Sequence, residues 1–280
     1  MTRIAVVGPA AWNRMVVLDA LPEPVPHMEF AREWFDTIGG TSAGKALHLT
    51  ALGRDVVLDT LLGDDEAGTR IRGAFEGAGV ALRTHRAARS EQHLNLMTPA
   101  GARLSLYLAT PDEPEPSATE PSVLDGVDLA VLDLAPRSGE LIPTARERGI
   151  PIWTDLHDYD GESAFHRPFL DGAEAVFMNA DRTDDPWALL AGCIEAGPQL
   201  AVCTLGAEGA IALDTYGRRA EVAAAPADIV DTNGAGDAFF SGFLDAWLDT
   251  AGDLDASLAG GARQAVIALS SRHLHPSLGA

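Results

Sequence analysis

Short apolar runs alternate along the chain with segments whose apolar positions recur every three or four residues. The apolar runs have the length of buried strands and lie at Ile4–Val7, Val56–Leu58, Leu129–Leu132, Ile152–Thr154, Val176–Met178, Leu200–Thr204 and Ala210–Leu213. The helical pattern covers Ala43–Leu52, Glu66–Gly77, Gly139–Arg148, Ala235–Leu248 and Leu254–Ser271. Strands and helices in alternation predict an α/β fold with a mostly parallel, doubly wound sheet.

Two stretches interrupt this alternation and predict a small antiparallel lid. Leu18–Ile38 is rich in proline and polar residues, and Gln92–Leu108 alternates apolar and polar positions around a turn at Pro99-Ala100-Gly101. The second stretch is typical of a β-hairpin. Thr110–Ser122, with its Pro and Glu residues, is expected to be a surface linker. We therefore expect one domain over residues 1–280, with lid segments near 18–38 and 92–108.

Composition and charge exclude several classes of function. A net charge of −21 excludes a nucleic-acid partner, since a phosphate backbone needs a basic face. The chain has no apolar run near the ~18 residues of a membrane span, so no membrane association is expected. Two cysteines are too few for a disulfide framework or a four-cysteine zinc site. The first residues lack the pattern of a signal peptide, and we expect a cytoplasmic protein.

The chemistry is concentrated in the string Asp231-Thr232-Asn233-Gly234-Ala235-Gly236-Asp237-Ala238-Phe239, which leads into a helix. Glycines ahead of a helix let backbone N–H groups converge at the positive end of the helix dipole, where an anion binds. A carboxylate in the first turn, such as Asp237, takes a proton from an incoming hydroxyl. For Gly-Ala-Gly-Asp alone, an ordinary glycine-rich loop is an equal alternative.

The whole string resembles the C-terminal signature of the PfkB/ribokinase family of sugar and nucleoside kinases, Asp-Thr-x-Gly-Ala-Gly-Asp-x-Phe. The resemblance implies a three-layer ribokinase-like sandwich with a small β-lid. It also implies that the backbone of Gly234, Ala235 and Gly236 forms an anion hole and that Asp237 activates the substrate hydroxyl. The family's region around Asp231 binds a monovalent cation in some members, which suggests K⁺ at Asp231.

Other motifs follow in family order. Gly39-Gly40 resembles the N-terminal signature that lines the sugar site, and Trp153-Thr154-Asp155 resembles the strand that ends in Asp before the phosphate site. Thr204-Leu205-Gly206-Ala207-Glu208-Gly209 resembles a nucleotide-binding loop, which implies nucleotide contacts for Thr204, Gly206 and Gly209.

Three positions depart from the family pattern. Asn13 stands where the family often has an Asp that grips sugar hydroxyls, and Gly44 stands where it usually has Asn. The Asn-x-x-Glu motif that organises Mg²⁺ through water reads Asn179-Ala180-Asp181-Arg182. Either Asp181 takes over the role of the Glu, or metal handling is altered.

Lys45 is the only lysine among 20 basic residues. It is either a solvated side chain on the first turn of a helix or a group beside the sugar site that meets an anionic or highly oxygenated acceptor. Gly39–Lys45 also matches most of a P-loop. Ala46 lacks the hydroxyl that such a loop offers to Mg²⁺, and the preceding Arg32–Thr37 is too polar for a buried strand, so the P-loop is disfavoured.

The resemblance implies an ATP-dependent kinase that uses Mg²⁺ and phosphorylates a hydroxyl of a sugar or sugar derivative. Asn13, Gly39, Gly40 and Lys45 would hold the acceptor, and Asn179 would belong to the nucleotide and metal site. One alternative is a nucleoside kinase, with a base cradle supplied by Trp12, Phe30, Trp34 and Phe35. The other is a sensor that binds sugar or nucleotide with weakened catalysis. A homodimer through the lid is also compatible with the predicted edge strand.

Overall fold

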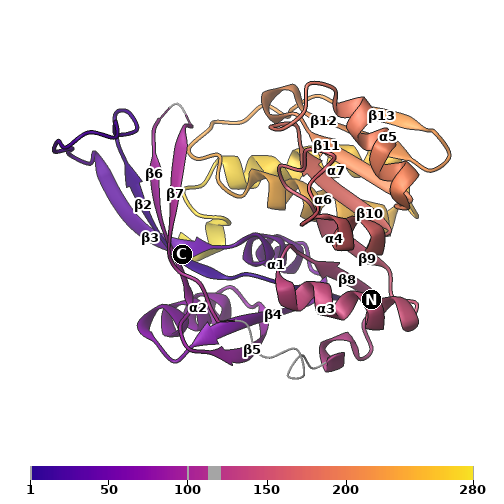
Figure 1. Ribbon diagram of the computed structural model, residues 1–280, viewed down its shortest axis with the longest axis horizontal. Helices are drawn as coiled ribbons and strands as arrows, with labels where there is room; N and C mark the ends of the chain where they lie inside the picture. Colours follow the sequence, from indigo (N-terminus) through magenta and orange to yellow (C-terminus); the bar gives the residue numbers. More distant parts are fainter. Residues whose placement is uncertain (1, 100, 113–120, 280) are drawn as a thin grey trace.

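A large, mostly parallel sheet runs through the centre of the molecule (Figure 1). The computed structural model describes residues 2–99, 101–112 and 121–279, and within these residues the strand order is β13-β12-β11-β10-β9-β8-β1-β4-β5. Neighbouring strands are parallel from β5 to β11, whereas β12 and β13 pair antiparallel at one edge. The strands are β1 (Arg3–Val7), β4 (Asp55–Gly63), β5 (Ala81–Ala87), β8 (Leu129–Leu132), β9 (Ile152–Asp155), β10 (Ala175–Asn179), β11 (Leu200–Thr204), β12 (Ala210–Asp214) and β13 (Arg219–Val222).

Helices cover both faces of this sheet and make three layers, as predicted. One face carries α1 (Thr41–Ala51), α2 (Glu66–Gly77), α6 (Ala235–Asp249) and α7 (Leu254–Leu269). The other face carries α3 (Pro136–Glu147), α4 (Arg167–Gly172) and α5 (Pro186–Ala196). Short 3-10 turns are η2 (Pro121–Leu124), η3 (Gly206–Glu208) and η4 (Pro276–Gly279).

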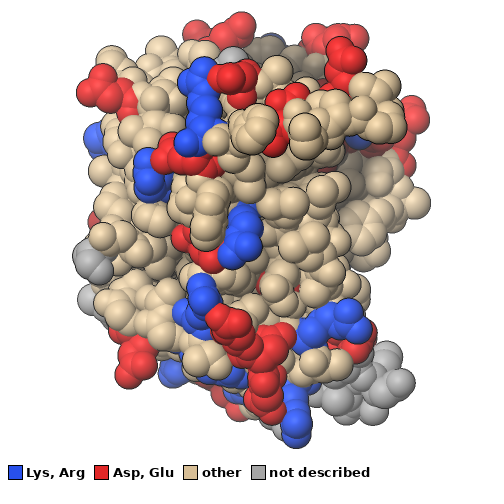
Figure 2. All heavy atoms as spheres, turned by 90° about the vertical axis from the view of Figure 1, so that its left-hand side faces the viewer, with Lys and Arg blue, Asp and Glu red and all other residues tan. Residues whose placement is uncertain are grey.

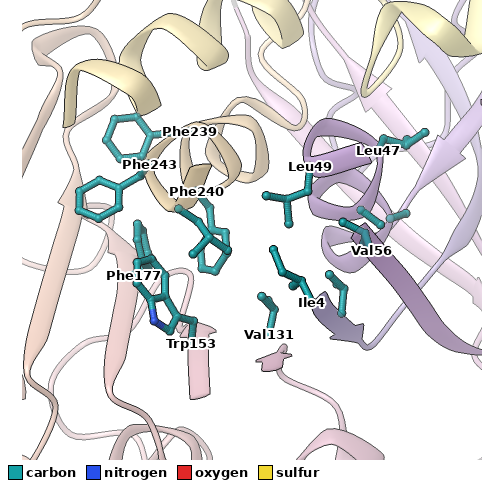
Figure 3. Packing of buried hydrophobic residues seen from close by; sticks show 14 of the residues in the cluster. Ile4, Leu47, Leu49, Val56, Val131, Trp153, Phe177, Phe239, Phe240 and Phe243 are labelled. Carbon is teal, nitrogen blue, oxygen red and sulfur yellow. The ribbon is translucent and has the colours of Figure 1, made fainter. Parts of the chain in front are cut away.

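The core is split by the sheet into two apolar clusters. Successive strand side chains point to opposite faces, so Ile4 packs toward α1 and α6 while Ala5 packs toward α3. Beneath α6, an aromatic group supports the helix, with the rings of Phe177 and Phe240 4.4 Å apart and those of Phe177 and Phe243 5.2 Å apart (Figure 3). This packing fixes the start of α6, which carries the glycine-rich string.

A second sheet, in the order β3-β2-β6-β7, forms the lid beside the main domain (Figure 1). Its strands are β2 (Ala11–Val17), β3 (Glu33–Gly39), β6 (Glu91–Met97) and β7 (Arg103–Ala109). β6 and β7 form the expected hairpin over 92–108; Ala100 of its turn lies outside the described residues. Of the first pair, β3 overlaps the expected segment 18–38, whereas β2 lies before it and ends at Val17. The expected linker at Thr110–Ser122 lies largely outside the described residues, since 113–120 are not among them.

On the lid side of the molecule, basic and acidic side chains are interleaved (Figure 2). The basic groups there form ion pairs such as Arg14 with Asp36 and Arg272 with Glu33. Among the described helices, none is long and apolar enough to cross a membrane.

Candidate active site

The glycine-rich string folds into a tight turn at the start of α6. Gly234 precedes the helix with a φ of 78°, a left-handed conformation that favours glycine, and a Cβ there would lie 2.7 Å from Cδ2 of Leu274. In the described structure, no side chain caps this helix. The Ala235 N–H donates to the Thr232 carbonyl oxygen at 3.4 Å, and the N–H groups of Gly236 and Asp237 remain available to a ligand. Gly234, Ala235 and Gly236 line a cleft of about 730 Å³. Backbone donors and the helix dipole together suit an anion such as phosphate.

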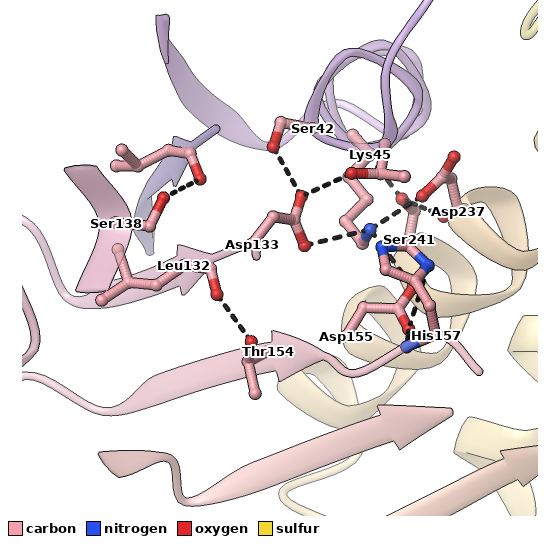
Figure 4. A network of polar contacts seen from close by, with 12 residues as sticks. Ser42, Lys45, Leu132, Asp133, Ser138, Thr154, Asp155, His157, Asp237 and Ser241 are labelled. Carbon is pink, nitrogen blue, oxygen red and sulfur yellow. Dashed lines mark hydrogen bonds and ion pairs between the residues drawn. The ribbon is translucent and has the colours of Figure 1, made fainter. Parts of the chain in front are cut away.

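Asp237 lies in the first turn of α6 and also lines this cleft. Its side chain is nearly buried, and its Oδ1 accepts a hydrogen bond of 2.7 Å from Nζ of Lys45 (Figure 4). Burial raises the pKa of Asp237 to about 6, with Lys45 opposing the shift. The carboxylate is therefore mostly ionised at neutral pH, yet more basic than an exposed aspartate.

Lys45 projects from α1 into the protein interior and is fully buried. Its Nζ lies 2.7 Å from Asp237, 3.1 Å from Asp133 and 3.3 Å from Asp155. Burial would lower the pKa of this ammonium, but the three carboxylates outweigh that effect and raise it. The ammonium of Lys45 is thus paired with three aspartates inside the protein. This pairing disfavours the expected contact between Lys45 and an anionic acceptor.

Asp133 and Asp155 reach Lys45 from neighbouring strands. Asp133 directly follows β8 and Asp155 ends β9, so both lie at the carboxyl edge of the sheet, where ligands of α/β proteins bind. Oδ2 of Asp133 accepts a 2.6 Å hydrogen bond from the Ser42 hydroxyl. Oδ1 of Asp155 accepts one of 2.9 Å from the His157 N–H. Sequence analysis missed Asp133, although it follows an apolar run much as Asp155 does.

The predicted nucleotide loop lies in the same cleft. Thr204 ends β11, Gly206 begins η3 and Gly209 follows it, and all three line the cleft together with Asn179. Gly209 has a φ of 107°, and a Cβ there would lie 1.9 Å from the Val222 carbonyl oxygen, so only glycine fits. Part of the remaining wall is apolar and was not predicted; this part includes Phe177, Met178, Ala224, Ala225, Ile229, Ala262, Ala265 and Leu269. An apolar wall beside an anion loop suits a nucleotide.

Arg182, which stands where the family has a Glu, does not line this cleft. The guanidinium of Arg182 lies 3.4 Å from Asp158 in an exposed ion pair. Asn179 and Asp181 both line the cleft, and Oδ1 of Asn179 accepts the Asp181 N–H at 3.0 Å. Oxygen ligands near a phosphate site suit Mg²⁺ bound through water. These two residues therefore fit the ion, although within the described residues no group of three or more His, Cys, Asp or Glu is arranged as a direct metal site.

The predicted acceptor residues meet at the base of the lid. Asn13 on β2 packs against Gly39 on β3, where a Cβ would lie 2.0 Å from Nδ2 of Asn13. Gly40 has a φ of 96°, and a Cβ there would lie 2.4 Å from the Pro9 carbonyl oxygen. Oδ1 of Asn13 is buried and has no hydrogen-bond partner among the described residues. A buried oxygen without a hydrogen bond lowers the free energy of unfolding by ~1–3 kcal/mol, and a ligand hydroxyl or a water that donates to it removes this cost.

The lid contacts the glycine-rich string, and the string also has an internal hydrogen bond. Arg103 of β7 donates a 3.2 Å hydrogen bond to Oδ1 of Asn233, which connects the lid to the string. The side chain of Asp231 accepts the Asn233 N–H at 2.9 Å, and burial raises the pKa of Asp231. Arg103 was not predicted, because nothing in a hairpin sequence indicates which residue reaches across a cleft.

Comparisons with known proteins agree with this geometry. Residues 169–278 match the profile described as pfkB family carbohydrate kinase. Over 253 residues the chain is 31% identical to an acarbose 7(IV)-phosphotransferase of an Actinoplanes species, covering 87% of this chain and 84% of that protein. It is 26% identical over 278 residues to an ATP-dependent ribose-1-phosphate kinase of Halopiger xanaduensis, covering 92% and 88%.

A solved structure resembles the chain over nearly its whole length. A microbiome-derived acarbose kinase superposes with a TM-score of 0.84 at 29% identity, covering 96% of this chain and 93% of that one. The shared fold extends over both the main sheet and the lid.

Proposed function

Because this chain belongs to the pfkB family of carbohydrate kinases, we propose that it transfers the γ-phosphoryl group of ATP to a hydroxyl of a sugar or sugar derivative, with Asp237 as general base. One observation carries the proposal. A nearly buried, ionised carboxylate lies in the first turn of an uncapped helix, inside a cleft that also holds the nucleotide loop.

The residues divide the reaction between them. Thr204, Gly206 and Gly209 hold the nucleotide, and the backbone N–H groups of Gly234, Ala235 and Gly236 stabilise the charge on the transferring phosphoryl group. Asp237 takes the proton of the acceptor hydroxyl as its oxygen attacks the γ-phosphorus.

Two ions complete the proposal. Asn179 and Asp181 would hold Mg²⁺ through water, and this ion supplies charge neutralisation on the phosphates when bound. Asp231 is proposed for a monovalent cation such as K⁺. Neither ion changes the assignment of Asp237.

A sugar is favoured over a nucleoside as the acceptor. Asn13 offers an unpartnered oxygen to a hydroxyl, and the similar proteins include kinases named for acarbose and ribose 1-phosphate. The aromatic residues expected to cradle a nucleobase are occupied or exposed instead. Phe30 is 85% exposed, and Trp12 and Trp34 lie against the guanidinium groups of Arg70 and Arg14. The sensor alternative keeps its motive, because the ion pair of Arg182 with Asp158 does not replace the missing Glu of the motif.

ATP consumption measured with acarbose, ribose, ribose 1-phosphate and inosine tests the proposal. Asp237→Asn removes the base without changing the shape of the side chain, so turnover should fall about 10²–10⁴-fold while nucleotide binding, measured by calorimetry, is retained. Thr250→Ala, which alters an exposed hydroxyl at the end of α6, is the matched control and should keep wild-type turnover. Near-normal turnover in Asp237→Asn would remove the base from the mechanism. Nucleotide binding without turnover on any acceptor would favour the sensor.

We further propose a cytoplasmic homodimer that pairs through its lids. β7 is an edge strand of the lid, and Leu104, Leu106, Tyr107 and Leu108 on it are exposed. An exposed apolar edge strand favours pairing with another strand. Light scattering that gives a monomer at micromolar concentration would contradict the dimer.

A further inference from the structure

Lys45 connects α1 to three carboxylates that come from separate parts of the chain (Figure 4). With all groups ionised, one positive charge faces three negative ones, which leaves an excess of two negative charges in a buried site. The Phe240 ring lies 5.2 Å from the same ammonium and closes the site below. A cluster with this imbalance favours proton uptake by one of its carboxylates.

The two oxygens of Asp237 have different surroundings. Oδ1 accepts the hydrogen bond from Lys45 at 2.7 Å. Oδ2 lies beside Gly44, where a Cβ would approach it to 2.8 Å. A side chain at position 44 would therefore displace the carboxylate. Gly44 and the adjacent Lys45 act on the same group, since Gly44 leaves room for Oδ2 and Lys45 binds Oδ1.

We propose that Lys45 is a positioning residue for Asp237, the general base. Nζ of Lys45 binds Oδ1 of Asp237, so that Oδ2 is the oxygen that receives the proton of the acceptor hydroxyl. This inference rests on the proposed role of Asp237. The acceptor O–H bond breaks as its oxygen bonds to the γ-phosphorus, the bond from that phosphorus to the leaving ADP oxygen breaks, and the proton moves to Oδ2. Lys45 keeps its three protons throughout and supplies the charge that holds Asp237 ionised before the reaction.

The groups that face Asp237 come from four elements. Lys45 lies on α1, Asp133 follows β8, Asp155 ends β9, and Ser241 on α6 donates a 2.8 Å hydrogen bond to the Asp237 carbonyl oxygen. His157 is next to Asp155, with 3.7 Å between Nδ1 and the carboxylate. The positive neighbour opposes protonation of Asp237, whereas the two negative neighbours favour it. Removing Lys45 or Asp133 should consequently shift the titration of Asp237 in opposite directions.

The test titrates Asp237 directly, without an acceptor. Protein labelled with ¹³C at the aspartate carboxyl is followed by NMR across the pH range, and the Asp237 signal is identified by its loss in Asp237→Asn. In Lys45→Met the Asp237 midpoint should rise by at least about one pH unit, a tenfold gain in proton affinity, and in Asp133→Asn it should fall. Unchanged midpoints in both variants would overturn the proposal.

The acid limb of the pH–rate profile then connects the titration to catalysis. The substrate is whichever of acarbose, ribose, ribose 1-phosphate and inosine the enzyme phosphorylates. In each variant, the pH at which kcat/KM falls on the acid side should shift by the same amount as the NMR midpoint of Asp237. A role for Lys45 in folding alone would lower the amount of active protein and leave the limb in place. A limb that stays in place while the NMR midpoint moves would also overturn the proposal.

The double variant Lys45→Met/Asp133→Asn guards against misfolding. It removes one charge of each sign and keeps the wild-type excess of two negative charges, so it should fold even where Lys45→Met does not. Its Asp237 midpoint should lie above that of Asp133→Asn alone. The two proposals can fail separately. Normal turnover in Asp237→Asn would refute Asp237 as the general base. Loss of turnover in Asp237→Asn, together with an unchanged NMR midpoint of Asp237 in the Lys45 variants, would refute only the role of Lys45.

Discussion

Two buried charge clusters flank β1, and their compositions are opposite. On the β4 side, Asp59 is fully buried and paired with Arg137 at 2.9 Å, His85 at 2.9 Å and Arg83 at 3.2 Å. On the β8 side, Lys45 is paired with three aspartates. We call these the Asp59 cluster and the Lys45 cluster. Both lie near the carboxyl edge of the sheet, so position alone does not separate them.

The difference lies in which side chains surround the central charge. In the Asp59 cluster a single carboxylate is faced by two guanidinium groups, which do not release a proton in proteins, and by His85. In the Lys45 cluster the excess is negative and resides on carboxylates, one of which titrates at about 6 and lines the cleft. The first cluster connects β4, β5 and α3. The second contains the carboxylate that we propose as the general base.

The largest expected effect on stability comes from breaking the Asp59 cluster. Asp59→Asn leaves the buried guanidinium of Arg137 without its counter-charge, which should lower the free energy of unfolding by about 3–5 kcal/mol in urea titrations. Asp128→Asn, which affects only an exposed hydrogen bond to the Arg3 N–H, serves as control and should change it by less than ~1 kcal/mol. A loss below ~1 kcal/mol for Asp59→Asn would contradict the structural role of the cluster.

A smaller effect of opposite sign is expected in the Lys45 cluster. The pKa of Asp237 is raised on folding, so ionising this group destabilises the folded state as the pH rises from the unfolded value toward about 6. Asp237→Asn cannot ionise and should gain about 3 kcal/mol, a Tm increase of several degrees, at about pH 8. The gain should vanish below about pH 4, where Asp237 is protonated in both states. A lower Tm than wild type at about pH 8 would mean that the pair with Lys45 outweighs the desolvation of Asp237.

The smallest effect comes from the rim of the Asp59 cluster. Arg83 keeps 30% of its side chain exposed, and Asp59 retains Arg137 and His85 without it. Arg83→Met should therefore lower the free energy of unfolding by less than ~1 kcal/mol, measured in the same urea titrations. A loss as large as that of Asp59→Asn would show that the cluster acts as one cooperative unit.

Much of the main sheet could be predicted, because its central strands are buried on both faces. Leu129–Leu132 and Leu200–Thr204 were predicted with the bounds that the structure shows. β5 and β13 were missed because edge strands carry charged residues, such as Arg83 and Arg219, and show no apolar run. β2 was missed because Asn13, a polar residue, occupies one of its buried positions and so interrupts the apolar pattern.

The candidate site was predictable where it is local in sequence. Gly234 to Asp237 form one turn, so their spacing already describes the anion loop. The Lys45 cluster joins residues up to 192 positions apart, and no pattern along the chain indicates such a contact. The same limit explains why Lys45 was assigned to the acceptor: its helix was predicted, but which side of the helix faces the interior depends on the strands packed against it.

The burial of Lys45 also determines how the protein reacts with chemical labels. Lys45 is the only lysine of the chain, and none of its side chain is exposed. Amine-selective reagents such as succinimidyl esters therefore find no side-chain amine on the folded surface. An acyl group on Lys45 would record that the cluster had opened, which turns a routine labelling reaction into a reporter of how often α1 separates from α6.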